Sequence, residues 1–379
     1  MDYYQKSLAL HKKKRGKIEI RSKVPLKTKE DLSVAYTPGV AEVCRAIGKD
    51  VTQSWLLTNR SNQVAVVSDG TAILGLGDLG PEAAMPVMEG KAIIFKEFAG
   101  IDAIPLCIDS TVPEEIVKFC KMIAPSFAGI NLEDISAPRC FDILKQLEQE
   151  LSIPVFHDDQ DGTAIVVLAA LINACRVTGK VMKELTVVVN GAGAAGIAIT
   201  KLLLEQGVKD AILLDSSGTI YRGRPGMNGF KIDIAKITNK KKIKGGLGEA
   251  LVGADVFVGV SKGNLVTEAM VRSMNEGPII FAMANPVPEI MPEAAYAGGA
   301  SIVGTGRSDL PNQVNNALVF PGLFRGLLDG KARGVSTKMK LAVAVAVAYT
   351  VKPTKAKLLP AVTDKKVVKA IRDVVIKYS

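Results

Sequence analysis

Short runs of apolar, largely β-branched residues alternate along this chain with longer segments in which apolar positions recur at helical spacing. The short runs predict strands at residues 64–67, 104–108, 129–132, 154–156, 187–189, 211–214, 254–260 and 278–284. The longer segments predict helices at residues 89–99, 113–124, 139–151, 164–175 and 197–206. Such alternation is typical of an α/β protein built on doubly wound parallel sheets.

The 379 residues are enough for two domains, and the polar stretch at residues 159–162 marks the predicted boundary. We expect an N-terminal α/β substrate or catalytic domain over residues 1–160. A Rossmann-type dinucleotide-binding domain with a C-terminal helical tail is expected over residues 161–379. Ser110 or Thr111 is the expected cap of the helix at residues 113–124.

A glycine-rich turn joins the strand at residues 187–189 to the helix that follows it. Its G-x-G-x-x-G pattern consists of Gly191, Ala192, Gly193, Ala194, Ala195 and Gly196. These glycines allow a tight turn, the approach of a pyrophosphate and close packing of the helix on the strand. Asp215 ends the next predicted strand, about 20 residues further on, as a dinucleotide-binding unit requires. The unit therefore predicts a site for NAD or NADP.

A second G-x-G-x-x-G occurs at residues 75–80. Pro81 and Pro86 flank it, and no strand ending in an acid follows at the required distance. We interpret it as a glycine-dense turn that lines a substrate cleft.

The formal net charge of +10 raises the question of a polyanionic partner. The basic residues gather in two short runs, residues 12–15 and 240–244, without interleaved aromatic residues or a nucleic-acid-binding motif. We interpret both runs as solvated loops and expect no nucleic-acid partner.

The five cysteines show no C-x-x-C spacing and mostly lie in apolar runs, which predicts buried thiols in a reducing compartment. The polar start of the chain does not resemble a secretion signal. The longest apolar run, residues 341–349, covers about half a membrane span and predicts a core helix. We expect a cytoplasmic protein with no membrane partner.

Three carboxylates follow predicted strands: Glu133, Asp134 and Asp159. Ligands of open α/β sheets collect beyond the carboxyl ends of the strands, so these acids are expected to form an oxygen-rich pocket. Mg²⁺ or Mn²⁺ suits such a donor set better than zinc does. Adjacent acids are also common as helix caps or solvated loop residues, and spacing alone leaves both interpretations open.

Histidine is scarce, since only His11 and His157 occur. A structural role is expected of His157, which stands beside the acidic pair. A lysine or a tyrosine is then an alternative general base, and Lys91 and Tyr36 are candidates.

Several blocks of the sequence form a recurring set: Glu133-Asp134 together with residues 157–164, and residues 35–40, 73–80, 89–91, 281–286, 311–316 and 320–322. Together these blocks resemble those of malic enzymes. The blocks run in family order over nearly the whole chain, whose length is similar to that of the short, prokaryotic-type members.

This resemblance implies the oxidative decarboxylation of malate to pyruvate and CO₂ with reduction of NAD or NADP. It implies that Glu133, Asp134 and Asp159 hold a divalent cation, which as a Lewis acid stabilises the enolate formed. Lys91 would remove the hydroxyl proton as hydride leaves C2. The pKa of a free lysine is about 10.4, so this role needs a pKa lowered by desolvation or by a nearby cation.

The remaining roles come from the same resemblance. Tyr36 would protonate C3 of the enol, and Asp158 would lie beside Lys91 and adjust its proton affinity. Asn285 and Asn316 would bind the substrate and the nicotinamide ribose. The family also implies a homodimer, and the sequence does not tell whether Tyr36 serves its own active site or that of a partner.

The match departs from the family at the position before residues 73–80. Many larger members carry an arginine there that clamps a substrate carboxylate, whereas this chain has Ala72. Arg307 is one candidate for the missing function. The family's Asn-Asp-Asp is His157-Asp158-Asp159 here, a change beside a ligand and not of one.

Cofactor choice depends on the end of the strand at residues 211–214. Asp215 favours NAD, because a carboxylate accepts a hydrogen bond from the ribose 2′-hydroxyl and repels a 2′-phosphate. Arg222 and Arg224 follow closely and are candidates to receive that phosphate, so NADP stays open. Two other functions remain as alternatives: a metal-independent amino-acid dehydrogenase and a non-catalytic NAD-binding regulator.

Overall fold

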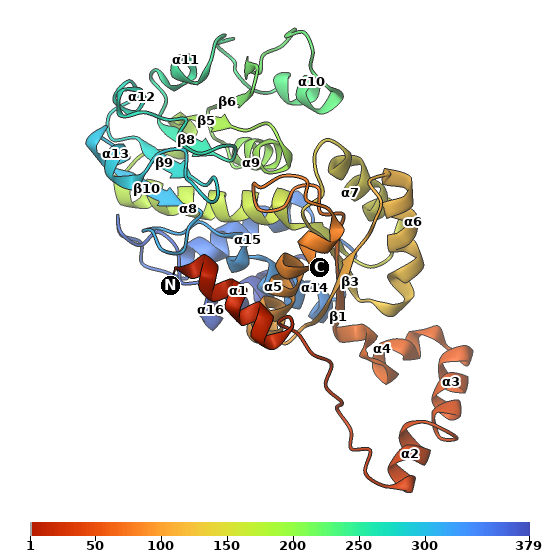
Figure 1. Cartoon of the computed structure of the whole chain (residues 1–379). Helices are drawn as coiled ribbons and strands as arrows, with labels where there is room; N and C mark the ends of the chain where they lie inside the picture. The colour runs from red at the N-terminus through yellow and green to blue at the C-terminus, as the bar shows by residue number, and fades with distance from the viewer. Residues whose placement is uncertain (1) are drawn as a thin grey trace.

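The computed structural model describes residues 2–379 and contains two sheets covered by helices (Figure 1). The first sheet has the strand order β2-β1-β3-β4, and all its pairs are parallel. Its strands are β1 (Gln63–Ser68), β2 (Asp102–Cys107), β3 (Gly129–Leu132) and β4 (Val155–His157). Val64 and Val66 of β1 face one core and Ala65 and Val67 face another, because successive side chains of a strand point to opposite faces.

Helices cover both faces of this first sheet. Residues of α6 (Pro113–Ile123) and α7 (Arg139–Glu150) share the core of Ala65 and Val67, and residues of α5 (Pro81–Ala99) share the other core. Burial on both faces explains why the strands read as continuous apolar runs.

The second sheet has the order β10-β9-β8-β5-β6-β7, in which only β7 is antiparallel. Its strands are β5 (Thr186–Asn190), β6 (Asp210–Asp215), β7 (Gly218–Thr219), β8 (Val256–Gly259), β9 (Ile279–Ala282) and β10 (Ile302–Thr305). Its helices are α9 (Ala194–Glu205), α10 (Gly229–Ala235), α11 (Leu247–Leu251), α12 (Glu268–Arg272) and α13 (Pro292–Ala297). The strand order reverses between β5 and β8, and at this switch point open α/β sheets bind their ligands. The predicted α/β architecture with a Rossmann-type sheet is confirmed.

The two sheets are joined by a π-helical turn, η4 (Asp158–Gly162), and by the apolar helix α8 (Thr163–Thr178). The stretch Asp158–Thr178 is long and apolar enough to cross a membrane, but 67% of its apolar window is buried inside the protein. It is a core helix. The same holds for α15 (Thr337–Tyr349), which packs against α8 and confirms the core helix predicted at residues 341–349.

The C-terminal helices α14 (Phe320–Asp329) and α16 (Lys365–Tyr378) pack against each other and against α5 of the first sheet. The ring of Phe95 on α5 lies 4.7 Å from that of Phe320 and 5.2 Å from that of Phe324. The core beside β1 is thus completed by residues from the far end of the chain. The boundary at residues 159–162 remains a prediction.

Four helices precede the first strand: α1 (Tyr3–Lys14), α2 (Lys29–Ala35), α3 (Val40–Lys49) and α4 (Ser54–Leu57). Figure 1 shows α2 and α3 projecting from the body of the molecule. None of the residues of α1, α2 and α3 is buried, although Leu32 and Val34 of α2 are large and apolar. Tyr36, the C-cap of α2, is also exposed. A segment of this composition has no core of its own within the single chain.

Some local predictions are wrong. Neither Ser110 nor Thr111 caps α6, whose N-cap is Val112 with no side-chain hydrogen bond, and Pro113 removes one of the donors that a cap would satisfy. The helix predicted from residue 89 begins at Pro81 and includes Pro86. All five cysteines are free, and Cys120 and Cys140 are buried, but Cys44 is exposed.

Candidate active site

A cleft of about 830 Å³ lies between the two sheets and is lined by residues of both. The first sheet contributes the loops that follow β3 and β4, and the second contributes the loops after β5, β8 and β9. Gly75 of the second glycine motif and Leu74, which precedes it, also line the cleft, as predicted for a turn beside a substrate cleft. The cleft thus combines a dinucleotide-binding edge with the carboxyl ends of the other sheet.

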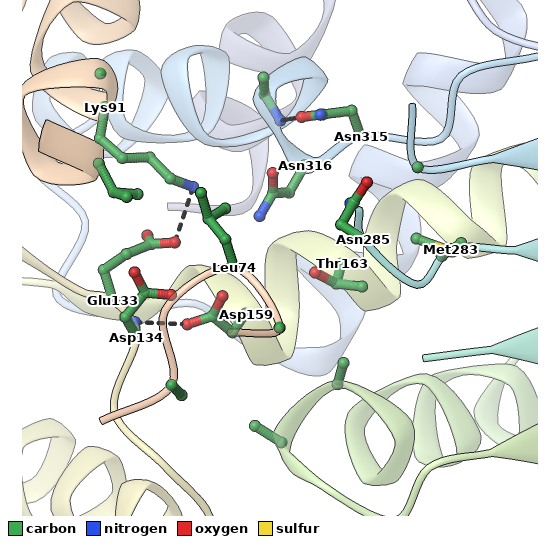
Figure 2. A pocket seen from close by; sticks show the side chains of 18 of the residues that line it. Leu74, Lys91, Glu133, Asp134, Asp159, Thr163, Met283, Asn285, Asn315 and Asn316 are labelled. Carbon is green, nitrogen blue, oxygen red and sulfur yellow. Dashed lines mark hydrogen bonds and ion pairs between the residues drawn. The ribbon is translucent and has the colours of Figure 1, made fainter. Parts of the chain in front are cut away.

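The three predicted metal ligands meet at one wall of this cleft. Leu132 of β3 is paired with His157 of β4, so the two strands end side by side. The acids that follow the two strands therefore start from the same edge of the sheet. Glu133, Asp134 and Asp159 each offer a ligand atom, and these atoms lie within 4.8 Å of one another (Figure 2). The backbone N–H of Asp134, a residue with φ of +53°, donates to Asp159 Oδ2 over 2.8 Å. Such a backbone in a non-glycine residue is held in place by the surrounding structure.

This cluster fits a divalent cation. Burial and neighbouring carboxylates raise the pKa of Glu133 to about 7 and that of Asp134 to about 9, and the pKa of Asp159 is raised as well. Asp134 Oδ2 is buried and makes no hydrogen bond to the described residues. Three carboxylates that suppress each other's ionisation, with an oxygen left free, form a donor set for Mg²⁺ or Mn²⁺.

A pH dependence of stability follows for the metal-free protein. The raised pKa values of Glu133 and Asp134 mean that the folded state holds protons that the unfolded state has released above about pH 4. Each such proton lowers the free energy of unfolding by about 1.4 kcal/mol per pH unit until the folded group also ionises. Stability without metal should therefore fall as pH rises from about 4 towards 9.

Thermal unfolding at pH 6 and pH 8, with EDTA or with Mn²⁺, measures this effect. We expect Mn²⁺ to raise the melting temperature more at pH 8, because fewer protons then compete for the carboxylates. The double variant Glu133→Gln, Asp134→Asn should lose most of its response to Mn²⁺ and should depend less on pH, the remaining dependence coming from Asp158 and Asp159, whose pKa values are also raised. An equal response to Mn²⁺ at both pH values would contradict the assignment.

Lys91 projects from α5 towards the acidic cluster (Figure 2). Its Nζ is hydrogen-bonded to Asp158 Oδ2, lies 3.0 Å from Glu133 Oε1, and stands 4.5 Å from the centre of the Phe320 ring. Burial lowers the pKa of Lys91, but Asp158 and Glu133 outweigh it and raise that pKa well above its usual range. A cation at the neighbouring carboxylates would cancel part of this negative potential and bring the pKa of Lys91 down.

The predicted neighbour of Lys91, Asp158, is in place and fully buried. Burial raises the pKa of Asp158 to about 7, with Lys91 opposing the shift. Space for this carboxylate depends on Gly162, because a Cβ there would lie 1.8 Å from Asp158 Oδ1. His157 is fully buried and does not line the cleft, and burial lowers its pKa to about 4. A neutral, buried ring is consistent with the structural role expected of it.

Tyr36 is the one predicted catalytic residue that lies apart from this cleft. It ends α2 on the projecting segment, with 65% of its surface exposed. The cleft-lining residues within 2–379 do not include it. The structure of the single chain therefore does not bring Tyr36 and Lys91 together.

Asn285 and Asn316 line the cleft opposite the acidic cluster (Figure 2). Among the described residues neither side-chain amide has a hydrogen-bond partner, whereas the neighbouring Asn315 accepts from the backbone N–H of Ala317. Both free amides are available to a ligand, and Asn315 instead caps the short helix beside them.

The glycine loop takes the form predicted for it. Gly191 has φ of +125°, and a Cβ on Gly196 would lie 1.7 Å from the carbonyl oxygen of Gly191. A Cβ on Gly193 would meet nothing within 4 Å, and Gly193, Ala194 and Ala195 line the cleft at the start of α9. Gly191 thus provides the tight turn, Gly196 allows the close packing, and Gly193 leaves room for a ligand to approach.

Asp215 ends β6 and is surrounded by cations. Arg224 donates to both its oxygens, at 2.9 and 2.5 Å, and Lys231 Nζ and the backbone N–H of Ser217 lie 2.6 and 2.9 Å from them. Burial opposes its ionisation, but Arg224 and Lys231 outweigh burial and lower the pKa of Asp215. These four donors fill the acceptor positions of the carboxylate. Arg222, the other arginine predicted here, is exposed.

Arg307 does not line the cleft. Its guanidinium pairs with Asp309 and donates to the carbonyl oxygen of Pro286. The suggestion that it binds a substrate carboxylate is therefore not supported by its contacts. Ala72 does line the cleft and contributes no charge.

Sequence reasoning missed two residues that shape the site. Phe320 places its ring against Lys91, a contact between distant parts of the chain that no local pattern reports. Glu289 is fully buried and accepts from the backbone N–H groups of Ser261 and Ala284. It thereby fixes the two loops that line the cofactor side of the cleft. In the sequence, Glu289 is a lone glutamate after the prolines of residues 286–288, and no motif there indicates that it holds two loops.

The fold and the site together define a dinucleotide-binding protein with an acidic, lysine-containing cleft. The model of the malic enzyme N-terminal domain matches residues 15–148, and that of the malic enzyme NAD-binding domain matches residues 160–379. The chain belongs to the malic enzyme family.

Named relatives are similar to this chain over all or nearly all of its length. A bifunctional malic/malolactic enzyme of Bacillus subtilis (strain 168) is 53% identical over 100% of this chain and 93% of its own length. An NAD-dependent malic enzyme of Geobacillus stearothermophilus is 53% identical over 95% of this chain and 76% of its own. The crystal structure of an NAD-dependent malic enzyme of Thermotoga maritima superposes with a TM-score of 0.94 at 47% identity, covering 99% of both chains.

Proposed function

We propose that this chain catalyses the oxidative decarboxylation of (S)-malate to pyruvate and CO₂, with reduction of NAD or NADP, and accepts oxaloacetate as a further substrate. The observation that carries the proposal is the position of Lys91. Its ammonium group lies 3.0 Å from Glu133, a member of the acidic cluster, in the same cleft that the glycine loop enters. The amino-acid dehydrogenase alternative gives no reason for three carboxylates to meet at that place, two of them buried.

Glu133, Asp134 and Asp159 would hold Mg²⁺ or Mn²⁺, and the glycine loop with Asp215 would hold the dinucleotide. When bound, these groups supply a Lewis acid for the substrate oxygens and an acceptor for the hydride. Lys91 takes the proton of the C2 hydroxyl, and Asp158 holds the ammonium group in position through its hydrogen bond. Asn285 and Asn316 orient the substrate and the nicotinamide ribose, because their amides are free of protein partners.

We further propose that the active form is a homodimer and that Tyr36 completes the cleft of the partner subunit. Tyr36 is exposed on a projecting segment without a core of its own. Packing against a second copy would bury the apolar side chains of that segment. Lys91 and the tyrosine of the other subunit would then form the acid–base pair that protonates C3 of the enol.

Both cofactors are proposed to bind. Asp215 is the residue that favours NAD, but Arg224 and Lys231 cancel its charge and occupy its oxygens. The ribose 2′-hydroxyl of NAD would replace one of these donors, and a 2′-phosphate would pair with the two cations. Named relatives include both NAD- and NADP-dependent malic enzymes.

The test is malate-dependent formation of NADH or NADPH, with pyruvate measured alongside, in the presence of Mn²⁺ or EDTA. We expect one pyruvate per reduced cofactor and loss of activity in EDTA that added Mn²⁺ restores. Activity that survives EDTA would favour the amino-acid dehydrogenase, and cofactor binding without turnover would favour the regulator.

We also propose a cytoplasmic location and small-molecule partners only. Five free cysteines, two of them buried, suit a reducing compartment. The basic run at residues 12–15 was predicted to be a loop, which is wrong, because α1 extends through Lys14. The run is exposed, in keeping with a solvated surface.

A further inference from the structure

The cleft contains one positive charge that makes no salt bridge to an acid of the described chain, although Glu89 lies nearby. Its lining includes two lysines, Lys17 and Lys91, and one histidine, His11. Lys91 is paired with Asp158 and Glu133, and a histidine carries a charge only when protonated. Within residues 2–379, Lys17 Nζ has no carboxylate oxygen within 4.0 Å and donates instead to the carbonyl oxygen of Pro86 over 2.6 Å.

The segment after α1 holds Lys17 against the helix that carries Lys91. The backbone N–H of Lys17 donates to Glu89 Oε2 over 3.1 Å, and Gly16, with φ of +103°, allows the chain to turn there. A Cβ on Gly90 would lie 3.6 Å from Lys17 Nζ. The ammonium group therefore lies next to Gly90, which has no side chain. Lys91 follows immediately in α5, and both ammonium groups therefore serve the same cleft.

The proposed substrate needs such a charge. Malate is a dianion, and the cleft already contains Glu133, Asp134 and Asp159, which repel anions unless they are compensated. Glu133, Asp134 and Asp159 would hold a cation, and the end of the substrate that carries the hydroxyl group would then bind at this wall of the cleft. The other carboxylate then requires a partner of its own, since an unpaired charge is costly to desolvate.

We propose that Lys17 binds the C4 carboxylate of malate, the group that leaves as CO₂. The contact is a charge-assisted hydrogen bond from Nζ to a carboxylate oxygen, made by exchanging the carbonyl oxygen of Pro86 for the substrate. Lys17 is a binding residue that selects substrates with a carboxylate at this position. This inference rests on the malate oxidation proposed above.

Steady-state kinetics of Lys17→Met, Lys17→Arg and the matched control Lys14→Met test the assignment. Lys14 is exposed in the last turn of α1 and does not line the cleft. For Lys17→Met we expect KM for malate and for oxaloacetate to rise about 10- to 100-fold. Inhibition by oxalate, which resembles the enolate of pyruvate and lacks the C4 carboxylate, should change less than about threefold. Lys17→Arg should recover part of the affinity, and Lys14→Met should behave as the unchanged enzyme.

An unchanged KM for malate in Lys17→Met would overturn the proposal. So would an equal loss of affinity for malate and oxalate, since that would indicate a general distortion of the cleft. If the unchanged enzyme does not oxidise malate, the proposed function itself fails, and this inference fails with it. Thermal unfolding of each variant, with Lys17→Arg as the milder change, separates loss of binding from loss of fold.

Discussion

Replacing Lys91 with methionine is expected to lower malate turnover about 10²- to 10⁴-fold, the range that a positioned acid–base group contributes. Lys91 holds the ammonium group that meets Asp158 and Glu133 at the metal-binding wall. Methionine keeps much of the length of the side chain and its contact with Phe320, but it cannot accept the hydroxyl proton. The loss should appear in kcat, because the acidic cluster and the amides that bind the substrate remain.

The matched control is Lys96→Met, on the same helix. Lys96 is exposed and pairs with Asp102, and its loss should leave turnover within about twofold. Because Lys91→Met leaves Glu133 and Asp158 buried without their counter-charge, its melting temperature should be measured with Mn²⁺ present. A folded Lys91→Met enzyme with near-native turnover would show that another group is the base.

Hybrid dimers of Tyr36→Phe and Lys91→Met subunits are expected to regain about half of the native activity, although each homodimer is almost inactive. If Tyr36 acts in the cleft of the partner, one of the two clefts in the hybrid combines an intact Lys91 with an intact Tyr36. If each tyrosine served its own chain, both clefts would be defective. Co-expression with two different affinity tags isolates the hybrid for direct assay.

The control hybrid combines Lys91→Met with Asp159→Asn. Both residues lie in the cleft of a single chain, so each cleft lacks one of them and the hybrid should remain inactive. A Tyr36→Phe, Lys91→Met hybrid that is no more active than its parents would place Tyr36 in its own subunit. Full activity in a monomer would also show that Tyr36 acts in the cleft of its own subunit.

The part of the site that could be predicted from sequence lies where strands end. Glu133, Asp134 and Asp159 follow β3 and β4, and parallel strands deliver their carboxyl ends to one edge, so pattern and topology predicted that these acids meet. The choice of a metal site over helix caps or solvated loop residues came from the resemblance to a family. The glycine loop was predictable for the same reason, because strand, turn and helix are contiguous. The roles of Lys91 and Tyr36 came from resemblance to a family and not from their spacing.

The remaining features depend on contacts between distant parts of the chain. Phe320 meets Lys91 only because α14 returns to α5, and local periodicity holds no information about such a return. Lys17 lies outside the basic run at residues 12–15 and belongs to no motif, and its place in the cleft becomes apparent only in the structure, with the hydrogen bond to Pro86. The failed cap of α6 has a local cause, since Pro113 reduces the need for capping.

The return of α14 and α16 to α5 also determines when this protein can fold. The core beside β1 includes Phe320 and Phe324, so the core on this face of the first sheet cannot be completed on the ribosome before the C-terminal helices have been synthesised. The emerging chain must leave part of its apolar surface exposed throughout translation. A fragment that ends at residue 160 would keep Val64, Val66 and Phe95 of this core but lose Phe320 and Phe324, so we expect it to fold poorly when expressed alone.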